Sequence, residues 1–397
     1  MIRLKDTKHA STADFLQNAI GIAEYYGFRP LDEMKTTRPD AARRKQIAKN
    51  EEGITYARKE ERTLASAARR CASCVNAKDG FLAWRTVQNA GGMPAVSLEL
   101  HAVGSPSAIA EALLLIVGNA IAEEAGLTKR TLSINNIGSF ESSNRFVRDV
   151  GSYLRKHLET ISPTLRPKAA EDPLGTLIQL IERGHPATPR APQATEYLTE
   201  DERRKFWELL EYLETLGMAY ELSPHVLGSR DCWAHSLYEL STMDEETGSR
   251  IAFAFGGRYD PLASRFALSP MHAATLTINC EIRGKTKTRR ETPGIPAIYF
   301  AHLGPEAKRR SLVILEALRQ AEIPVHQSLL FERIGEQMAQ AKRMATPYIL
   351  IVGYKEAMEN TVLVREVSTN SQEAVPVEDL AGYLRRRRLG AMKELVA

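Results

Sequence analysis

Three short groups of residues have types and spacings that could do chemistry. Cys71 and Cys74 form a CxxC pair, but a tetrahedral zinc site needs four Cys or His ligands, and neither a second CxxC nor a nearby pair of histidines is present. We therefore expect no bound metal and two reduced thiols. Arg230, Asp231 and His235 could form a catalytic cluster, yet polar residues this close in sequence are usually a polar stretch, which is the interpretation we prefer.

A third group, residues 256–260, reads GGRYD and follows the apolar run IAFAF. Paired glycines allow tight backbone turns, so one interpretation is a structural turn in which Arg258 and Asp260 pair locally. The other interpretation is a ligand pocket at the end of a strand. The residues alone leave both open.

The elements that must position these residues follow from the spacing of apolar residues. Residues 15, 19, 22, 23 and 26 are apolar at helical spacing, and Gly27 ends that pattern. Pro is frequent between 160 and 195, which predicts irregular connections around one short helix. Helices are expected at residues 12–28, 107–125, 143–158 and 200–216, and strands at 95–103, 131–137, 237–240 and 251–255.

Pro and Gly in residues 291–296 (ETPGIP) indicate a linker and a domain boundary. Beyond it strands alternate with helices, which predicts a compact α/β domain with a largely parallel sheet. Its strands are expected at residues 297–301, near 325, at 348–353 and at 361–366, and its helices at 306–321, 334–344 and 377–387.

Length, composition and charge limit the classes of protein to which the chain can belong. The chain has 397 residues, which predicts two or three domains, and its 43% hydrophobic and 26% charged residues are typical of a soluble globular protein. No apolar run approaches the roughly 18 residues of a membrane span, and the N-terminus lacks the apolar stretch of a signal peptide, so we expect a cytoplasmic protein without membrane contact. The net charge of +4 is too small to indicate nucleic-acid binding by itself.

Several motifs in one order resemble the histidyl-tRNA synthetases. GGRYD at 256–260 resembles a signature beside their amino-acid pocket, EYYGF at 24–28 resembles the first helix of their catalytic core, and INNIG at 134–138 resembles a strand end of that core. Residues 328–380 resemble the anticodon-binding domain shared by several class II synthetases. The resemblance covers nearly the whole chain.

The resemblance implies an α+β class II synthetase-like core in residues 1–290, with an antiparallel six-stranded sheet flanked by helices, followed by an α/β anticodon-binding domain in residues 296–397. It also implies a homodimer, although the proline of the family's dimer motif is replaced near Glu33 and Met34. Within the core, residues 160–216 form a helical or irregular insertion. Residues 35–70 form a charged arm, an exposed or mobile segment with no recognised counterpart, where a protein partner could bind.

Aminoacylation requires positive charge at the ATP α-phosphate, because attack by the amino-acid carboxylate builds negative charge there. Residues 85–100 contain no counterpart of the family's arginine-bearing motif 2 loop. In motif 3, Asn279 and Cys280 stand where Glu and Arg belong. Both arginines that the family uses are therefore missing.

The histidine-specific motifs also depart from the family. The RGLDYYT motif falls on residues 228–234, where only Asp231 matches, and the FHQxGxE strand falls on 100–106, which lacks the Gln and Glu. An EGT-like segment is absent around residues 64–69. These losses favour a pseudoenzyme with no cofactor. Its vestigial pocket would comprise Gly256, Gly257, Arg258, Tyr259 and Asp231.

We therefore predict a noncatalytic tRNA-binding or regulatory paralogue whose C-terminal domain contacts RNA phosphates and bases. A basic helix end is also favoured by the helix dipole whatever the partner, so the arginine run does not prove RNA contact. The residues predicted to bind RNA are Lys342, Arg343, Arg365, Arg385, Arg386, Arg387 and Arg388.

Two alternatives stay open. A divergent active histidine-tRNA ligase would use ATP and Mg²⁺, with an anion clamp supplied by Arg85, Arg230 or Arg283. A protein-binding regulator would resemble the synthetase-like subunit of ATP phosphoribosyltransferase. That subunit lacks the anticodon-binding domain, so the C-terminal part of this chain argues against it.

Overall fold

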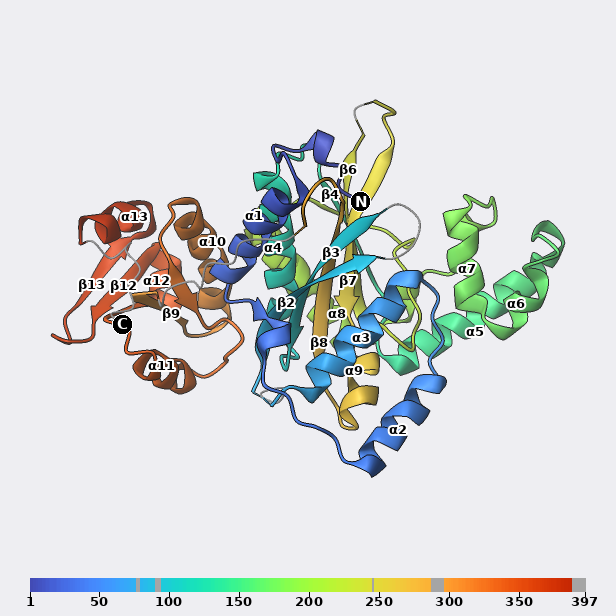
Figure 1. Ribbon diagram of the computed structural model, residues 1–397, viewed down its shortest axis with the longest axis horizontal. Helices are drawn as coiled ribbons and strands as arrows, with labels where there is room; N and C mark the ends of the chain where they lie inside the picture. Colours follow the sequence, from blue (N-terminus) through green and yellow to red (C-terminus); the bar gives the residue numbers. More distant parts are fainter. Residues whose placement is uncertain (76–78, 90–93, 245, 287–295, 388–397) are drawn as a thin grey trace.

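The computed structural model describes residues 1–75, 79–89, 94–244, 246–286 and 296–387. Two β-sheets, each with its own helices, lie side by side along the long axis of the molecule (Figure 1). Most of the linker expected at 291–296 lies outside the described residues. No helix of the described part is long and apolar enough to cross a membrane.

The first sheet has the strand order β1-β2-β3-β8-β7-β6-β4-β5. Its six inner strands pair antiparallel, as the sequence predicts, whereas the short β1 and β5 pair parallel with their neighbours at the edges. The strands are β1 Arg29–Pro30, β2 Phe81–Asn89, β3 Ala95–Val103, β4 Thr131–Asn136, β5 Tyr220–Leu222, β6 Ala234–Met243, β7 Arg250–Arg258 and β8 Ala273–Glu281.

Helices cover both faces of this sheet, so β3 in its middle is buried at all nine residues. The strand expected at 95–103 is confirmed, but the alternation of its apolar residues does not divide it into a buried and an exposed face. Its polar residues Ser97, Glu99 and His101 are as buried as its apolar ones, because α3 and α9 cover the face from which they project.

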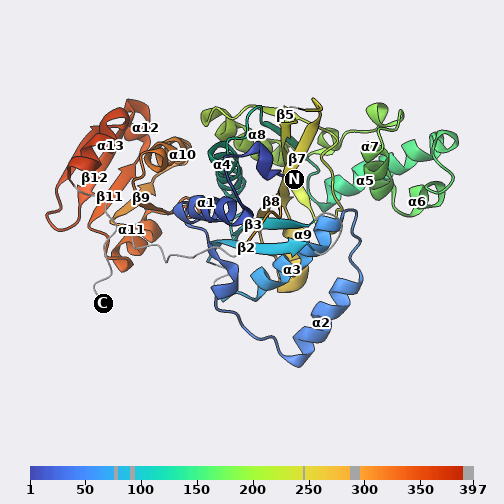
Figure 2. The ribbon, with the colours of Figure 1, turned by 45° about the horizontal axis from the view of Figure 1, so that its top comes forward.

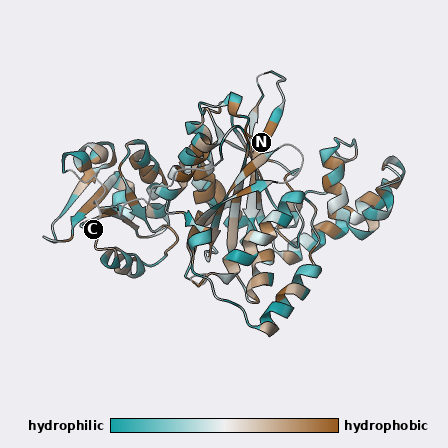
Figure 3. Ribbon diagram, in the orientation of Figure 1, coloured by the Kyte–Doolittle hydropathy of each residue, from teal (hydrophilic) through white to brown (hydrophobic). Residues whose placement is uncertain are grey.

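One face of the first sheet is covered by α1, α4 and α8, which share a hydrophobic core with it. Helix α4 is apolar almost all round and is buried at most positions (Figure 3). Gly118 lets α4 approach the sheet, because a Cβ there would lie 2.4 Å from Cδ2 of Leu276 on β8. These helices are α1 Thr12–Tyr25, α4 Ile109–Glu124 and α8 Glu200–Thr215.

The other face belongs to a second hydrophobic cluster, to which α3, α5, α6, α7 and α9 contribute. The prolines at 167 and 173 each stand at the start of a helix, where a missing N–H costs nothing. The expectation of a single short helix between 160 and 195 is therefore wrong. These helices are α3 Lys59–Ser73, α5 Phe140–Lys156, α6 Arg166–Glu171, α7 Pro173–Glu182 and α9 Asp260–Ala267.

The charged segment 35–70 contains α2, which spans Ala41–Glu52, and most of α3. Helix α2 has no buried residue and reaches out from the core, where polar contacts such as Arg43 to the Ala267 carbonyl oxygen (3.0 Å) hold it (Figure 2). Helix α3 differs, because Leu64, Ala68 and Cys71 bury one of its faces.

The second sheet has the strand order β10-β9-β11-β12-β13. Strands β10, β9 and β11 are parallel, but β12 and β13 are antiparallel, so the expected largely parallel sheet is mixed. The turn between β12 and β13 is too short for a parallel crossover. The strands are β9 Ile298–His302, β10 Val325–Gln327, β11 Tyr348–Val352, β12 Thr361–Glu366 and β13 Gln372–Pro376, and the helices are α10 Pro305–Gln320, α11 Ile334–Arg343, α12 Tyr354–Glu359 and α13 Val377–Arg386.

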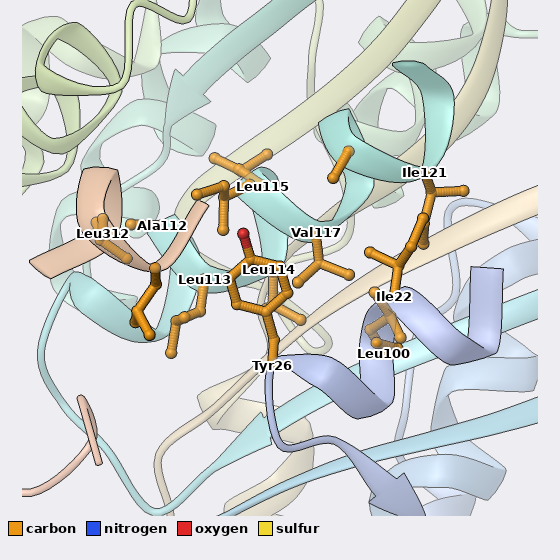
Figure 4. Packing of buried hydrophobic residues seen from close by; sticks show 14 of the residues in the cluster. Ile22, Tyr26, Leu100, Ala112, Leu113, Leu114, Leu115, Val117, Ile121 and Leu312 are labelled. Atoms are coloured by element: carbon orange, nitrogen blue, oxygen red, sulfur yellow. The ribbon is translucent and has the colours of Figure 1, made fainter. Parts of the chain in front are cut away.

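The two halves pack through Tyr25 and Tyr26. Tyr26 is fully buried, and its ring lies among Leu113, Leu114 and Val117 of α4 (Figure 4). Its hydroxyl donates to Glu316, and the Tyr25 hydroxyl donates to the carbonyl oxygen of Ile323 at 2.9 Å. One hydrophobic cluster therefore runs through both halves.

Candidate functional site

Gly256 and Gly257 lie inside β7, in the middle of the sheet, and do not form the turn that the sequence suggested. A Cβ at Gly256 would lie 2.1 Å from the Thr275 carbonyl oxygen, and one at Gly257 would lie 2.5 Å from that of Ser236. The glycines are required because the backbones of β6 and β8 approach β7 closely on either side.

Arg258, the last residue of β7, is buried and points to the start of α4. Its Nε and Nη2 donate to Glu111 Oε2 at 3.0 and 2.9 Å. Nη1 and Nη2 also donate to the carbonyl oxygens of Ser105 and Ser107, each at 3.1 Å, and Nη1 lies 3.5 Å from Asp260 Oδ1. These five contacts match the five donors of a guanidinium, so no N–H of Arg258 is left for a ligand.

Asp260 is the first residue of α9, and it holds the start of β8 in place. Its Oδ1 accepts from the backbone N–H of Ala273 at 2.8 Å, and its Oδ2 lies 2.9 Å from His272 Nδ1. Burial alone would raise the pKa of Asp260, but the contact with His272 and the charge of Arg258 hold it below its usual value. The predicted pairing of Arg258 with Asp260 is present, although Glu111 is the closer partner.

A cavity of about 50 Å³ lies beside Arg258, Asp260 and His272. This volume has room for a few water molecules and not for a nucleotide. His235 also lines the cavity. Burial lowers the pKa of His235, so its ring is neutral at neutral pH.

Tyr259 is fully buried under α3, and its hydroxyl lies 3.3 Å from His101 Nδ1. His101 Nε2 in turn lies 3.4 Å from Glu99 Oε2, and the same oxygen accepts from Arg85 Nε at 2.6 Å. Burial would raise the pKa of Glu99, but His101 and Arg85 hold it lower. Sequence reasoning missed this buried network, because its residues lie on β2, on β3 and at the start of α9, which only the fold brings together.

Asp231 stands apart from Arg258. Its carboxylate accepts from Arg265 Nη2 at 2.7 Å and from the backbone N–H of Thr55 at 2.9 Å, which ties α9 to the segment before α3. Arg230 donates to Asn144. Arg230 and Asp231 therefore have different partners, and His235 lies beside the cavity next to Arg258, so the structure does not bring the three together as the less favoured catalytic cluster.

Glu61 is a second buried carboxylate that sequence reasoning missed. It accepts from the backbone N–H groups of Ala57 (2.6 Å) and Ser229 (2.8 Å) and from Trp233 Nε1 (3.0 Å). The sequence signal that could have identified Glu61 is its position in the first turn of α3. A carboxylate at this position binds the free N–H groups at the start of a helix.

The three arginines considered as an anion clamp lie in different environments. Arg85 Nη2 donates to the Thr63 carbonyl oxygen at 3.1 Å, in addition to its ion pair with Glu99. Arg230 lies over the ring of Phe140. The backbone N–H of Arg283 donates to Thr12 Oγ1, which places this residue beside the start of α1. Within the described part of the chain, no group of three or more His, Cys, Asp or Glu side chains could hold a metal ion.

The structure divides the predicted RNA-binding residues between the two faces of the second sheet. Helices α10 and α13 cover one face and α11 the other (Figures 1 and 2). Lys342 and Arg343 end α11, and Arg365 projects from the same face because it pairs with Ile349, which packs under α11. Residues 385–387 lie at the end of α13 on the opposite side. Arg388 lies outside the described residues.

A groove of about 1510 Å³ separates α11 from the edge of the first sheet. Four basic side chains line it together with three acidic ones. The basic residues are Arg29, Arg333, Lys342 and Arg343, and the acidic ones are Asp79, Glu332 and Glu336.

Comparisons with known proteins agree with this architecture. Residues 299–387 match the family model described as "Anticodon binding domain". The chain is 24% identical over 299 residues to the histidine-tRNA ligase of Lysinibacillus sphaericus, covering 73% of this chain and 69% of that protein. It is 26% identical over 288 residues to the histidine-tRNA ligase of Thermosynechococcus vestitus, covering 71% of this chain and 66% of that protein.

The solved structure of the histidyl-tRNA synthetase of S. aureus superposes with a TM-score of 0.50 at 16% identity, over 96% of this chain and 98% of that one. The antiparallel sheet with its appended anticodon-binding domain defines a class II synthetase fold. Within that class, the chain is similar in sequence to histidine-tRNA ligases.

Proposed function

We propose that this protein is a noncatalytic histidyl-tRNA synthetase-like protein that binds tRNA. The observation that carries the proposal is the groove between α11 and the first sheet, into which Lys342, Arg343 and Arg333 project from the anticodon-binding half. Phosphate contacts from such side chains position an RNA, while bases are read by neighbouring groups. Both relatives named above are tRNA ligases, which favours tRNA over other RNA.

The noncatalytic part of the proposal rests on how the arginines of the core are used. The guanidinium of Arg258 has all its donors engaged, and that of Arg85 is paired with Glu99 beneath α3. Neither can stabilise charge that develops on a phosphate without first losing a buried partner, which is costly. The small cavity beside Arg258 supports the same conclusion.

Titration calorimetry with ATP and histidine, alone and together with Mg²⁺, followed by tRNA at several salt concentrations, tests the proposal. We expect saturable binding of tRNA that weakens with salt, and no saturable heat from ATP or histidine. Saturable binding of both small molecules would overturn the noncatalytic assignment and favour an active ligase. No binding of any of the three would reject the RNA assignment and favour a protein partner.

We further propose that the protein is a cytoplasmic homodimer and that α2 binds a partner protein. The exposed helix α2, with no buried residue, supports the second assignment. Light scattering after size-exclusion chromatography tests the dimer: a mass near 44.2 kDa, that of one chain, would reject it.

A further inference from the structure

A second cavity, of about 190 Å³, lies where the two halves of the molecule meet. Ser107, Glu208 and Tyr212 line it from the first half, and the residues around the end of β9 and the start of α10 line it from the second. An enclosed cavity of about 150 Å³ accommodates a benzene molecule, so this one has room for a small organic molecule. It lies on the α10 face of the second sheet, whereas much of the RNA groove lies beside α11, and the exposed Glu332 lines both.

The cavity lies at the place in the fold where open parallel sheets bind ligands. The chain leaves β9 towards β10 on one side, while β11 continues the sheet on the other, so the carboxyl end of β9 is a topological switch point. Gly304, with φ of +92°, turns the chain directly into the 16-residue α10. The free N–H groups in the first turn of a helix favour an anion.

His302 gives independent evidence of a ligand. It is the last residue of β9, is 1% exposed, and lines the cavity, and neither of its ring nitrogens has a hydrogen-bond partner among the described residues. Unpaired buried polar groups are costly and rare, so they call for an explanation. Burial, followed by Lys308, lowers the pKa of His302 to about 4, against weaker opposing effects of Glu332 and of the Ser328 backbone, which approaches the ring without meeting hydrogen-bond geometry. The neutral ring therefore presents one N–H and one lone pair.

The backbone of His302 is held firmly in place. Gln337, fully buried on α11, donates to the His302 carbonyl oxygen at 3.0 Å and accepts from its N–H at 2.9 Å. The unpartnered ring thus belongs to a residue whose position is fixed, which is what a binding site requires.

Lys308 supplies a positive charge in the first turn of α10. It is 4% exposed, and its Nζ lies 2.6 Å from Glu332 Oε1. The Glu332 side chain is 63% exposed, so it can turn to solvent and leave the ammonium to a ligand. On the opposite wall the Glu208 carboxylate accepts from the Tyr212 hydroxyl at 3.3 Å and can accept from a donor on the ligand as well.

We propose that this junction cavity binds a small organic acid of about amino-acid size. Its carboxylate or phosphate lies against the first turn of α10 and Lys308, its middle contacts the ring of His302, and a hydroxyl or ammonium donates to Glu208. The site shares Glu332 with the RNA groove, but its existence does not depend on RNA binding.

Nuclear magnetic resonance of the full chain, labelled with ¹⁵N in its nine histidines, tests the site. His302→Gln assigns the ring resonances. Acetate, glycine and inorganic phosphate are then titrated into the unsubstituted protein at constant ionic strength. We expect a saturable shift of the His302 resonances. Comparison of the three probes tells whether a lone carboxylate, a carboxylate with an ammonium, or a phosphate binds best. No saturable shift with any of them overturns the proposal.

Two substitutions test the assigned roles. Lys308→Met should abolish the shift, whereas Lys355→Met, on an exposed lysine of α12, should leave it unchanged. Glu332→Gln removes the competing carboxylate from a largely exposed side chain and should tighten binding about fivefold, the size of an ordinary ion pair at the protein surface. Glu336→Gln is its control. Glu332→Gln changes a side chain that is 63% exposed, and weaker or unchanged binding in it would contradict the site even if Lys308→Met proved unstable.

Discussion

At the scale of single residues, the GGRYD sequence resembles the synthetase signature, but here its arginine has a structural role. Arg258 is saturated by Glu111, by two backbone carbonyl oxygens and by Asp260, which makes it part of the framework that holds α4 against β7. The sequence could identify the motif and the pairing of Arg258 with Asp260, but not Glu111, which lies 147 residues away along the chain.

Replacing Arg258 with Met should therefore destabilise the protein strongly. The substitution leaves Glu111 buried without its cation, and breaking a buried pair in this way costs about 3–5 kcal/mol. Urea denaturation measures the free energy of unfolding. The double variant Arg258→Met with Glu111→Leu should recover part of the loss, and equal losses in the single and double variants would show that the ion pair is not the cause.

The glycines of the motif make a second prediction. Gly256→Ala places a Cβ against the Thr275 carbonyl oxygen, so it should lower the thermal midpoint and the soluble yield. Gly21 is the matched control, because it lies in α1 with nothing within 4 Å of its Cβ position. Gly21→Ala should stabilise the protein by about 0.5–1 kcal/mol through the helix propensity of Ala. A neutral Gly256→Ala would mean that β7 can move away from β8.

At the scale of elements, the start of α8 is tied to that of α5 by one carboxylate. Glu202 accepts from the backbone N–H groups of Ser139 (2.6 Å) and Thr199 (2.8 Å) and from the Ser142 hydroxyl (2.7 Å). Burial would raise the pKa of Glu202, but these hydrogen bonds lower it to about 2. The carboxylate thus caps two helices at once.

This pKa predicts how stability depends on pH. A Glu in an unfolded chain has a pKa of about 4.3, so the stabilisation by Glu202 is complete above that value and is lost as pH falls towards 2. Glu202→Gln should therefore be less stable than the unsubstituted protein at neutral pH, and the difference should shrink over that range. Thermal melting curves recorded at a series of pH values measure this difference in stability. Glu200→Gln, on an exposed residue of the same turn, should show no such dependence.

Which elements the sequence predicts depends on their length and pattern. The helical pattern of apolar residues 15, 19, 22 and 23 is enough to place α1, and β3 falls where expected because its apolar residues alternate with polar ones as in a strand. Strands β4 and β12 also fall where expected. Strand β13 is missed because four of its five residues are exposed. Strand β2 is missed because polar residues interrupt it. The candidate site depends on contacts between residues that are far apart in sequence, such as Arg258 and Glu111, and a local sequence pattern cannot reveal such contacts.

At the scale of the whole molecule, the two faces of the second sheet separate basic residues that look equivalent in sequence. Lys342 and Arg343 line the groove, whereas Arg385 and Arg386 lie on the other side of the sheet. Lys342→Glu with Arg343→Glu should therefore weaken tRNA binding by at least tenfold and reduce its dependence on salt.

The matched control is Arg385→Glu with Arg386→Glu, which changes the net charge by the same amount. It should weaken tRNA binding little. Filter binding across a salt series measures both variants. Equal losses would show that only overall charge matters and that the groove is not the binding surface.

The hydrophobic core that the two halves share around Tyr25 and Tyr26 fixes their relative position. A half that is joined to its neighbour by buried side chains cannot swing as a hinged clamp would, so the gap between the halves keeps a set width. Under the proposed function, the groove would act as a gauge that accepts an RNA whose curvature fits a fixed opening.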